Sequence, residues 1–196
     1  MFCRTEMKKI IILLLVSPVL FTTTTANAAK CKFQTDTVNV LTGEKIRWTK
    51  WISFKFVIKP DHVFINAISE GERMYVGLRV HSRESQIERP TKDDLDNTLL
   101  IPAAAKLSIL MADDSVLELH TDNQVVGDSD FRLLDSGDYR ITSEAVIKYS
   151  LNDYTMGILT TQRIKQLRLQ TSESDIEFDL SKRGTDKHQE SLACIQ

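Results

Sequence analysis

The sequence predicts a mainly β fold, an antiparallel sandwich or small barrel with one or two short helices near the C-terminus. Apolar residues recur at every second position through most of the chain, the spacing that places them on one face of a strand. Turn signals recur about every eight to twelve residues, and apolar residues at helical spacing are scarce. Together these patterns favour several short antiparallel strands over a helical bundle or a parallel sheet.

The N-terminal residues have the three parts of an export signal. Lys8 and Lys9 precede the apolar run "IIILLLVSPVLF", and Ala26-Asn27-Ala28 supplies the small residues that a signal peptidase recognises. The apolar run is too short to span a bilayer as a helix. We therefore predict a signal peptide over residues 1–28 and a periplasmic or secreted location. Met7 begins the more typical leader "MKKIIILLLV", so it is an alternative start of translation.

The chain that remains after cleavage is mildly acidic. The full sequence has 25 basic and 27 acidic residues. The predicted leader contains three basic residues and one acidic residue, so residues 29–196 have 22 basic and 26 acidic residues and a net charge of −4. No dense basic segment is present to neutralise phosphates, so we predict no nucleic-acid partner. No later segment resembles a membrane span. Residues 29–196 are enough for one core, and we predict a single β-rich domain.

The predicted mature chain has two cysteines, Cys31 and Cys194, at its two ends. Thiols pair in an oxidising compartment, and two cysteines allow one intramolecular bond, so we predict a structural Cys31–Cys194 disulfide. A redox thiol normally has a second cysteine at CxxC spacing or an activating base beside it, and neither cysteine has such a neighbour in sequence. A bridge between two molecules is the remaining alternative.

The clearest alternation lies in "IRWTKWISFKFVI", residues 46–58. One parity holds the residues expected to face the core: Ile46, Trp48, Ile52, Phe54, Phe56 and Ile58. Trp51 falls on the opposite, solvent-facing parity. Lys50 and Trp51 interrupt the pattern, which predicts a β-bulge or a strand break at "TKW". Pro60-Asp61 is expected to end the run in a turn.

The rest of the chain continues in short strands. We predict them at residues 62–69, 73–80, 106–111, 131–134, 139–142 and 144–151, with a hairpin turn at Asp113-Asp114-Ser115. One or two helical turns are expected from Thr160 or Thr161, followed by a strand pair, "LRLQT" and "DIEFDL". A terminal helix is predicted over residues 185–194, with Thr185 as its cap and Leu192 and Ile195 as its apolar contacts.

The acidic segment 83–97 is the longest stretch without a clear pattern, and we predict it as a loop. Long loops in compact domains often carry function, so this segment is a candidate binding surface. We predict its carboxylates Asp93, Asp94 and Asp96, together with the exposed Trp51, as binding residues. Trp51 lies near Arg47 and Lys55, a combination of aromatic and basic residues that suits a glycan or a single-stranded nucleic acid.

The motifs of metal sites and cofactor sites are missing. None of the four histidines forms an HxH, an HExxH or a zinc-type pair with a cysteine, and His81 and His120 are expected to be surface or turn residues. The segments "KDDLDN" and "GDSDFRLLDSGD" offer ligands for calcium but lack EF-hand spacing, so we interpret them as solvated turns. We predict no metal and no cofactor.

The sequence also selects no catalytic residues. It lacks a GxSxG elbow and a glycine-rich phosphate loop, and nothing distinguishes a pair of carboxylates for glycoside hydrolysis. We therefore predict a non-enzymatic binding protein, or an inhibitor-like or immunity-like protein, of the bacterial envelope, with a protein or envelope component as partner. The alternative is a small cell-wall or glycan hydrolase that uses acidic residues brought together by the fold.

Overall fold

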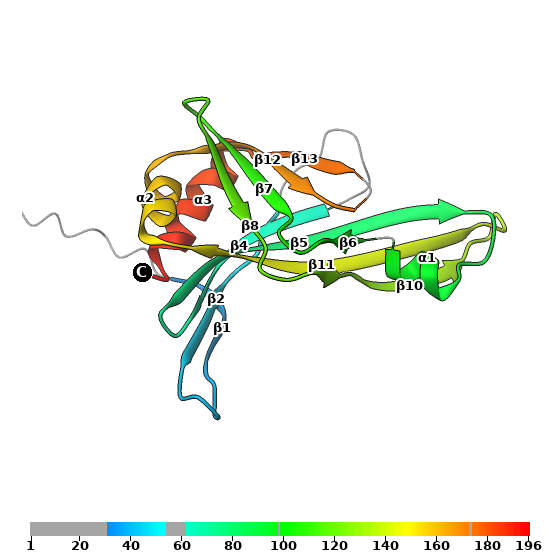
Figure 1. Ribbon diagram of the computed structural model, residues 1–196, viewed down its shortest axis with the longest axis horizontal. Helices are drawn as coiled ribbons and strands as arrows, with labels where there is room; N and C mark the ends of the chain where they lie inside the picture. Colours follow the sequence, from blue (N-terminus) through cyan, green and yellow to red (C-terminus); the bar gives the residue numbers. More distant parts are fainter. Residues whose placement is uncertain (1–30, 54–61, 98, 173) are drawn as a thin grey trace, which may run out of the picture.

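The fold is mainly β and antiparallel, as predicted (Figure 1). The computed structural model describes residues 31–53, 62–97, 99–172 and 174–196. The strands are β1 (Phe33–Val38), β2 (Lys45–Thr49), β3 (Ile52–Ser53), β4 (His62–Glu70), β5 (Arg73–Gln86), β6 (Leu100–Ile101), β7 (Lys106–Met111), β8 (Val116–His120), β9 (Val125–Val126), β10 (Asp128–Leu133), β11 (Tyr139–Leu151), β12 (Ile164–Gln170) and β13 (Asp175–Asp179). The helices are α1 (Lys92–Asn97), α2 (Asp153–Thr161) and α3 (Lys182–Ala193).

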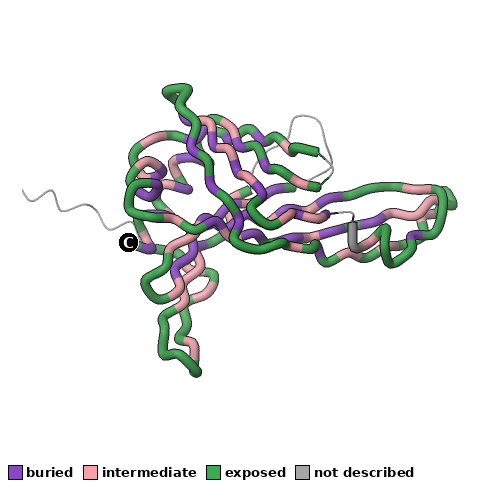
Figure 2. The backbone as a smooth tube through the Cα atoms, viewed as in Figure 1, coloured by how far each residue is buried: buried purple, intermediate pink, exposed green. Residues whose placement is uncertain are grey.

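The strands form one large sheet and two smaller ones. The large sheet is a curled half-barrel with the order β1-β2-β4-β5-β11-β10, and β3 pairs with β4 beside β2. The second sheet has the order β13-β12-β7-β8, and β6 pairs with β9. Alternate residues of β4, β5 and β11, such as Val63, Leu78 and Ile147, are fully buried against β7, β12, α2 and α3. The core therefore lies between one face of the curled sheet and a layer made of the second sheet and two helices (Figure 2).

The predicted interruption at "TKW" is confirmed as an irregularity between β2 and β3. Trp48 pairs with Ile68 and Ile52 pairs with Ile65, so three residues of this segment oppose two of β4. The extra residue reverses the side-chain parity. Ile52 packs against the core as expected, but Trp48 lies on the other face, where the Lys148 ammonium is 5.2 Å from its ring centroid. The prediction that Trp48 points into the core is therefore wrong.

Several predicted strands are found with different lengths. The strand expected at 73–80 continues to Gln86, and those expected at 139–142 and 144–151 are one strand, β11, which pairs with β5 over its whole length. The expected hairpin β7–β8 and the final pair β12–β13 are present. The predicted contributions of Phe54, Phe56, Ile58 and the Pro60-Asp61 turn lie outside the described residues, as does the predicted signal peptide.

The segment 83–97 is not a continuous loop. Its first residues extend β5, and residues 92–97 form the short helix α1. A capping box begins this helix: the Thr91 amide donates to the Asp94 carboxylate at 2.8 Å, and the Asp94 amide donates to the Thr91 hydroxyl at 3.3 Å. The spacing Thr-x-x-Asp carried that signal in the sequence.

The two C-terminal helices begin earlier than predicted. Asn152 caps α2 through its side chain, so the helix begins at Asp153. It ends at Thr161, a position at which a helix was expected to begin. Ser181, and not Thr185, caps α3. Thr185 is instead buried, and its hydroxyl donates to the Ile164 carbonyl at 2.9 Å. Leu192 and Ile195 are buried, as expected for the apolar contacts of this helix.

The predicted disulfide between Cys31 and Cys194 is present, with 5.6 Å between the two Cα atoms. It joins Cys31, two residues before β1, to the C-cap residue of α3, so the first described residue meets the end of the last helix. None of the helices in the described ranges is long and apolar enough to cross a membrane.

Candidate functional site

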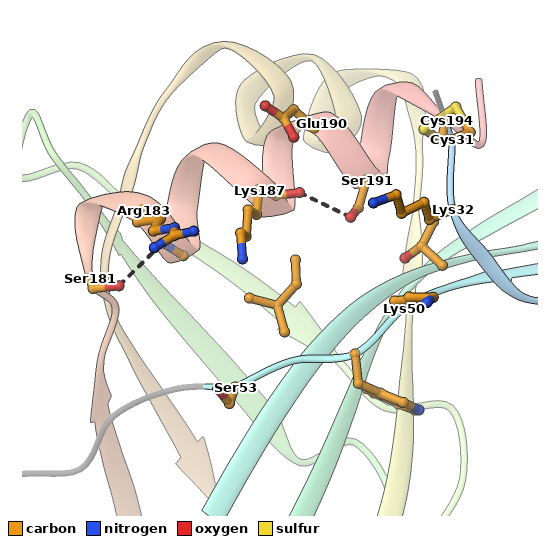
Figure 3. Close-up of a pocket in the computed structure, with 14 residues that line it drawn as sticks. Cys31, Lys32, Lys50, Ser53, Ser181, Arg183, Lys187, Glu190, Ser191 and Cys194 are labelled. Carbon is orange, nitrogen blue, oxygen red and sulfur yellow. Dashed lines mark hydrogen bonds between the residues drawn. A yellow bond between two sulfur atoms is a disulfide. The ribbon is translucent and has the colours of Figure 1, made fainter. Parts of the chain in front are cut away.

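A groove of about 850 Å³ lies between α3 and the segment that links β2 to β3 (Figure 3). The disulfide lies at one end of it. The α3 side contributes Ser181, Arg183, Gly184, Lys187, Glu190, Ser191 and Cys194, and the facing side contributes Cys31, Lys32, Thr49, Lys50, Trp51, Ile52 and Ser53. These residues come from positions 31–53 and 181–194, so only the folded chain assembles the site.

The helical wall follows from the periodicity of α3. Arg183, Lys187, Glu190 and Ser191 recur at intervals of three or four residues, which places them on one face of the helix. The opposite face buries Thr185, His188 and Leu192. Packing of this apolar face against α2 and β4 therefore turns the basic face toward the groove.

The facing wall is held by hydrogen bonds at the β2–β3 irregularity. The buried Thr49 hydroxyl accepts from the Ala67 amide at 2.9 Å, which fixes the start of the irregular segment on β4. The Lys50 amide donates to the Lys32 carbonyl at 3.3 Å, so these two lysines are kept next to each other. Trp51 is half-buried and lines the groove.

The groove is electropositive. Of the residues that the structure describes, four cationic side chains line it, Lys32, Lys50, Arg183 and Lys187, against one carboxylate, that of Glu190. Within the described ranges, none of the four forms an ion pair with a carboxylate, whereas the nearby Arg163 pairs with Asp186 at 3.2 Å. This concentration of unpaired positive charge occurs in a protein whose full sequence has a net charge of −2.

The helix itself disfavours this arrangement of charge. Arg183 and Lys187 are like charges at i and i+4, a pairing that destabilises a helix by about 0.2–0.5 kcal/mol. Arg183 also lies in the first turn, near the positive end of the helix dipole, and that turn has no acidic residue. A bound anion would relieve both repulsions, so the groove is suited to negatively charged ligands.

The predicted binding residues do not form one site. Trp51 lies in the groove, whereas Asp93, Asp94 and Asp96 belong to α1, which packs near β10 toward the opposite end of the large sheet (Figure 1). Hydrogen bonds from the Thr91 amide and hydroxyl hold the pKa of Asp94 below its usual value. That carboxylate therefore has a structural role as part of the helix cap.

The histidines lie apart from the groove lining. His81 is in the middle of β5, opposite His62, and is half-buried, so it is not in a turn. Burial lowers the pKa of His81, although the Glu144 carboxylate, 3.3 Å from its Nε2 atom, acts in the opposite direction. His120 is exposed at the end of β8, as expected. His188 is fully buried behind the basic face of α3.

The described residues contain no group of three or more histidine, cysteine, aspartate or glutamate side chains arranged to hold a metal ion. In the second acidic segment, Asp130 accepts from the Phe131 amide and Asp138 accepts from the Ser136 hydroxyl. Asp138 thus stabilises the turn between β10 and β11, whereas Asp130 makes a local contact within β10.

A second groove, of about 480 Å³, lies beside the C-terminus. Its lining includes Arg47 and two exposed carboxylates, Glu72 and Asp153. It is smaller than the first groove and mixes charges of both signs.

Arg183 and Lys187 were not among the sequence candidates. Their signal was the repetition of basic residues at i and i+4 in the first turns of a helix, inside an acidic chain. No protein-family model, curated protein or solved structure matches this protein, so its chemistry is argued from its own residues.

Proposed function

We propose that the protein is a non-enzymatic, exported binding protein that takes an anionic ligand into the groove between α3 and the β2–β3 segment. The observation that carries this proposal is the set of four unpaired cations around one groove of an acidic protein. Lysine and arginine donate charge-assisted hydrogen bonds to carboxylate, sulfate or phosphate oxygens. The disulfide supports an oxidising location, either the periplasm or the cell exterior.

The composition of the groove favours binding over catalysis. Among the described residues, its lining has one carboxylate and no histidine, so these residues offer neither a carboxylate pair nor an imidazole base for proton transfer. Its cations and Trp51 can fix the charge and position of a ligand. The ligand is therefore expected to leave the groove unchanged.

Reversal of one groove charge tests the proposal. Lys187→Glu should weaken the binding of tripolyphosphate, a compact polyanion, at least tenfold in isothermal titration calorimetry, because it replaces an attraction with a repulsion. Lys182→Glu is the matched control, since Lys182 is exposed on the same helix but does not line the groove. Equal losses in the two variants, or no binding by the wild-type protein, would contradict the proposal.

The second groove supports the alternative of a glycan hydrolase, because Glu72 and Asp153 both line it. Two carboxylates across a sugar site are the machinery of most glycosidases. If this reading is correct, the wild-type protein releases reducing sugars from cell-wall glycan, and Glu72→Gln and Asp153→Asn each abolish the release. Absence of release by the wild-type protein would remove this alternative.

A further inference from the structure

The four cations of the groove form a row along its length (Figure 3). Arg183 lies toward the N-terminal end of α3, Lys187 follows near the middle, and Lys32 and Lys50 lie toward the disulfide. With a rise of 1.5 Å per residue, the helical wall from Arg183 to Cys194 is about 16 Å long, and Arg183 and Lys187 are about 6 Å apart along the axis. A compact anion can contact only part of this row, whereas an extended anion can contact all of it.

The spacing of the row distinguishes between extended polyanions. A nucleic-acid duplex carries one negative charge about every 1.7 Å of its axis, which is far denser than the cations of the groove. The net charge of −2 also opposes long, highly charged nucleic acid outside the groove. A polymer with more widely spaced charges, such as a chain of acidic sugars, matches the row better.

The uncharged part of the lining suits sugar rings. Trp51 is half-buried and contributes an aromatic ring, which can pack against the apolar face of a sugar while its N–H remains available as a donor. The hydroxyls of Ser53, Ser181 and Ser191 lie along the same groove. Ser191 donates to the Lys187 carbonyl and Ser181 accepts from the Gly184 amide, so each retains capacity for a bond to a sugar hydroxyl.

We propose that the ligand of the groove is a stretch of acidic polysaccharide that lies along α3, with its anionic groups on Arg183, Lys187 and the Lys32–Lys50 pair and one sugar ring on Trp51. This inference rests on the proposed function, because it names the ligand class of the same groove. The anionic groups can be carboxylates or sulfates, since both accept charge-assisted hydrogen bonds from lysine and arginine.

Length dependence of binding tests the inference. Titrations would use galacturonic acid and its dimer, tetramer and octamer, with sulfated oligosaccharides of the same lengths in a parallel arm that distinguishes the two anionic groups. Affinity should rise at least tenfold from monomer to tetramer in at least one arm, and less than threefold from tetramer to octamer, because the row of cations has a fixed length. The better arm identifies the anionic group.

Variants at the ends of the groove provide the residue-level test. Arg183→Glu and Lys50→Glu should each weaken binding of the preferred octamer at least tenfold, and Lys182→Glu should change it less than twofold. Trp51→Ala should lower the affinity for the octamer at least tenfold and change the affinity for tripolyphosphate less than twofold. Retained binding of tripolyphosphate would also show that the groove of this variant is folded.

The outcomes separate this inference from the proposed function. An octamer of glutamate or single-stranded DNA that binds as tightly as the preferred octasaccharide would overturn the assignment to a polysaccharide. Binding of tripolyphosphate without any length dependence in the sugars would overturn the inference and leave the proposed function standing. Failure of every anion to bind would overturn both.

Discussion

His188 has the most unusual environment of any ionisable side chain in the described part of the protein. It is fully buried on the inner face of α3, and neither ring nitrogen has a hydrogen-bond partner. Burial lowers its pKa to about 4, because the imidazolium ion would lose its hydration. The neutral ring therefore packs as part of the core beneath the wall of the groove.

This burial predicts that acid destabilises the protein. The unfolded chain binds a proton at His188 near pH 6.5 and the folded chain only near pH 4, so the free energy of unfolding falls as the pH drops through this window. The loss from His188 should approach about 3 kcal/mol at pH 4. Urea titrations between pH 7 and pH 4 measure it. His188→Leu should flatten this dependence, whereas His120→Leu, at an exposed position, should preserve it.

The two tryptophans show why residue-level predictions from alternation can fail. Trp48 and Ile52 have the same parity in the sequence, yet they lie on opposite faces of the sheet, because the segment between them has one residue more than the segment between their partners Ile68 and Ile65. The interruption at "TKW" was visible in the sequence. Its effect on Trp48 depended on the register against β4, a strand more than ten residues away.

At the scale of elements, the β2–β3 irregularity depends on Thr49. Its hydroxyl is buried and satisfies the Ala67 amide, which otherwise faces a gap in the ladder. Thr49→Val keeps the shape of the side chain but removes the acceptor, so it should lower the free energy of unfolding by about 1–3 kcal/mol. Thr37→Val, at an exposed position of β1, is the control and should change it by less than about 0.5 kcal/mol. Chemical denaturation of both variants and of the wild-type protein measures the difference. Equal stability of Thr49→Val and the wild-type protein would show that water or another group replaces the Thr49 hydroxyl as acceptor.

The helices illustrate which local signals compete. In "NDYTMGILTT", Asn152 and Thr155 form a complete capping box, and this local chemistry places α2 before the threonines at which a helix was expected to begin. In α3, Ser181 precedes Thr185 by four residues, and both side chains can cap a helix. Tertiary packing decides between them, because Thr185 is used in a buried bond to β12.

At the scale of the whole molecule, the disulfide closes a loop of 163 residues in sequence separation and also forms one end of the groove. In the chain-entropy model such a loop stabilises the fold by about 5 kcal/mol. A Cys31→Ser, Cys194→Ser double variant should therefore melt at a much lower temperature in calorimetry. It should also bind tripolyphosphate more weakly at a temperature where it is still folded, because Lys32 loses its attachment to α3. An unchanged melting temperature would contradict the structural role of this bond.

The β character, most strand positions, the strand irregularity at "TKW" and the disulfide could be predicted from the sequence alone. Each depends on local alternation, on turn chemistry or on the single pair of cysteines that follows the predicted signal peptide. The groove was decided by tertiary structure. Its cations come from residues 32, 50, 183 and 187, and no local rule relates positions separated by more than a hundred residues. They meet because α3 packs its buried face on β4 while the disulfide brings Cys31, and with it the adjacent Lys32, to the end of that helix.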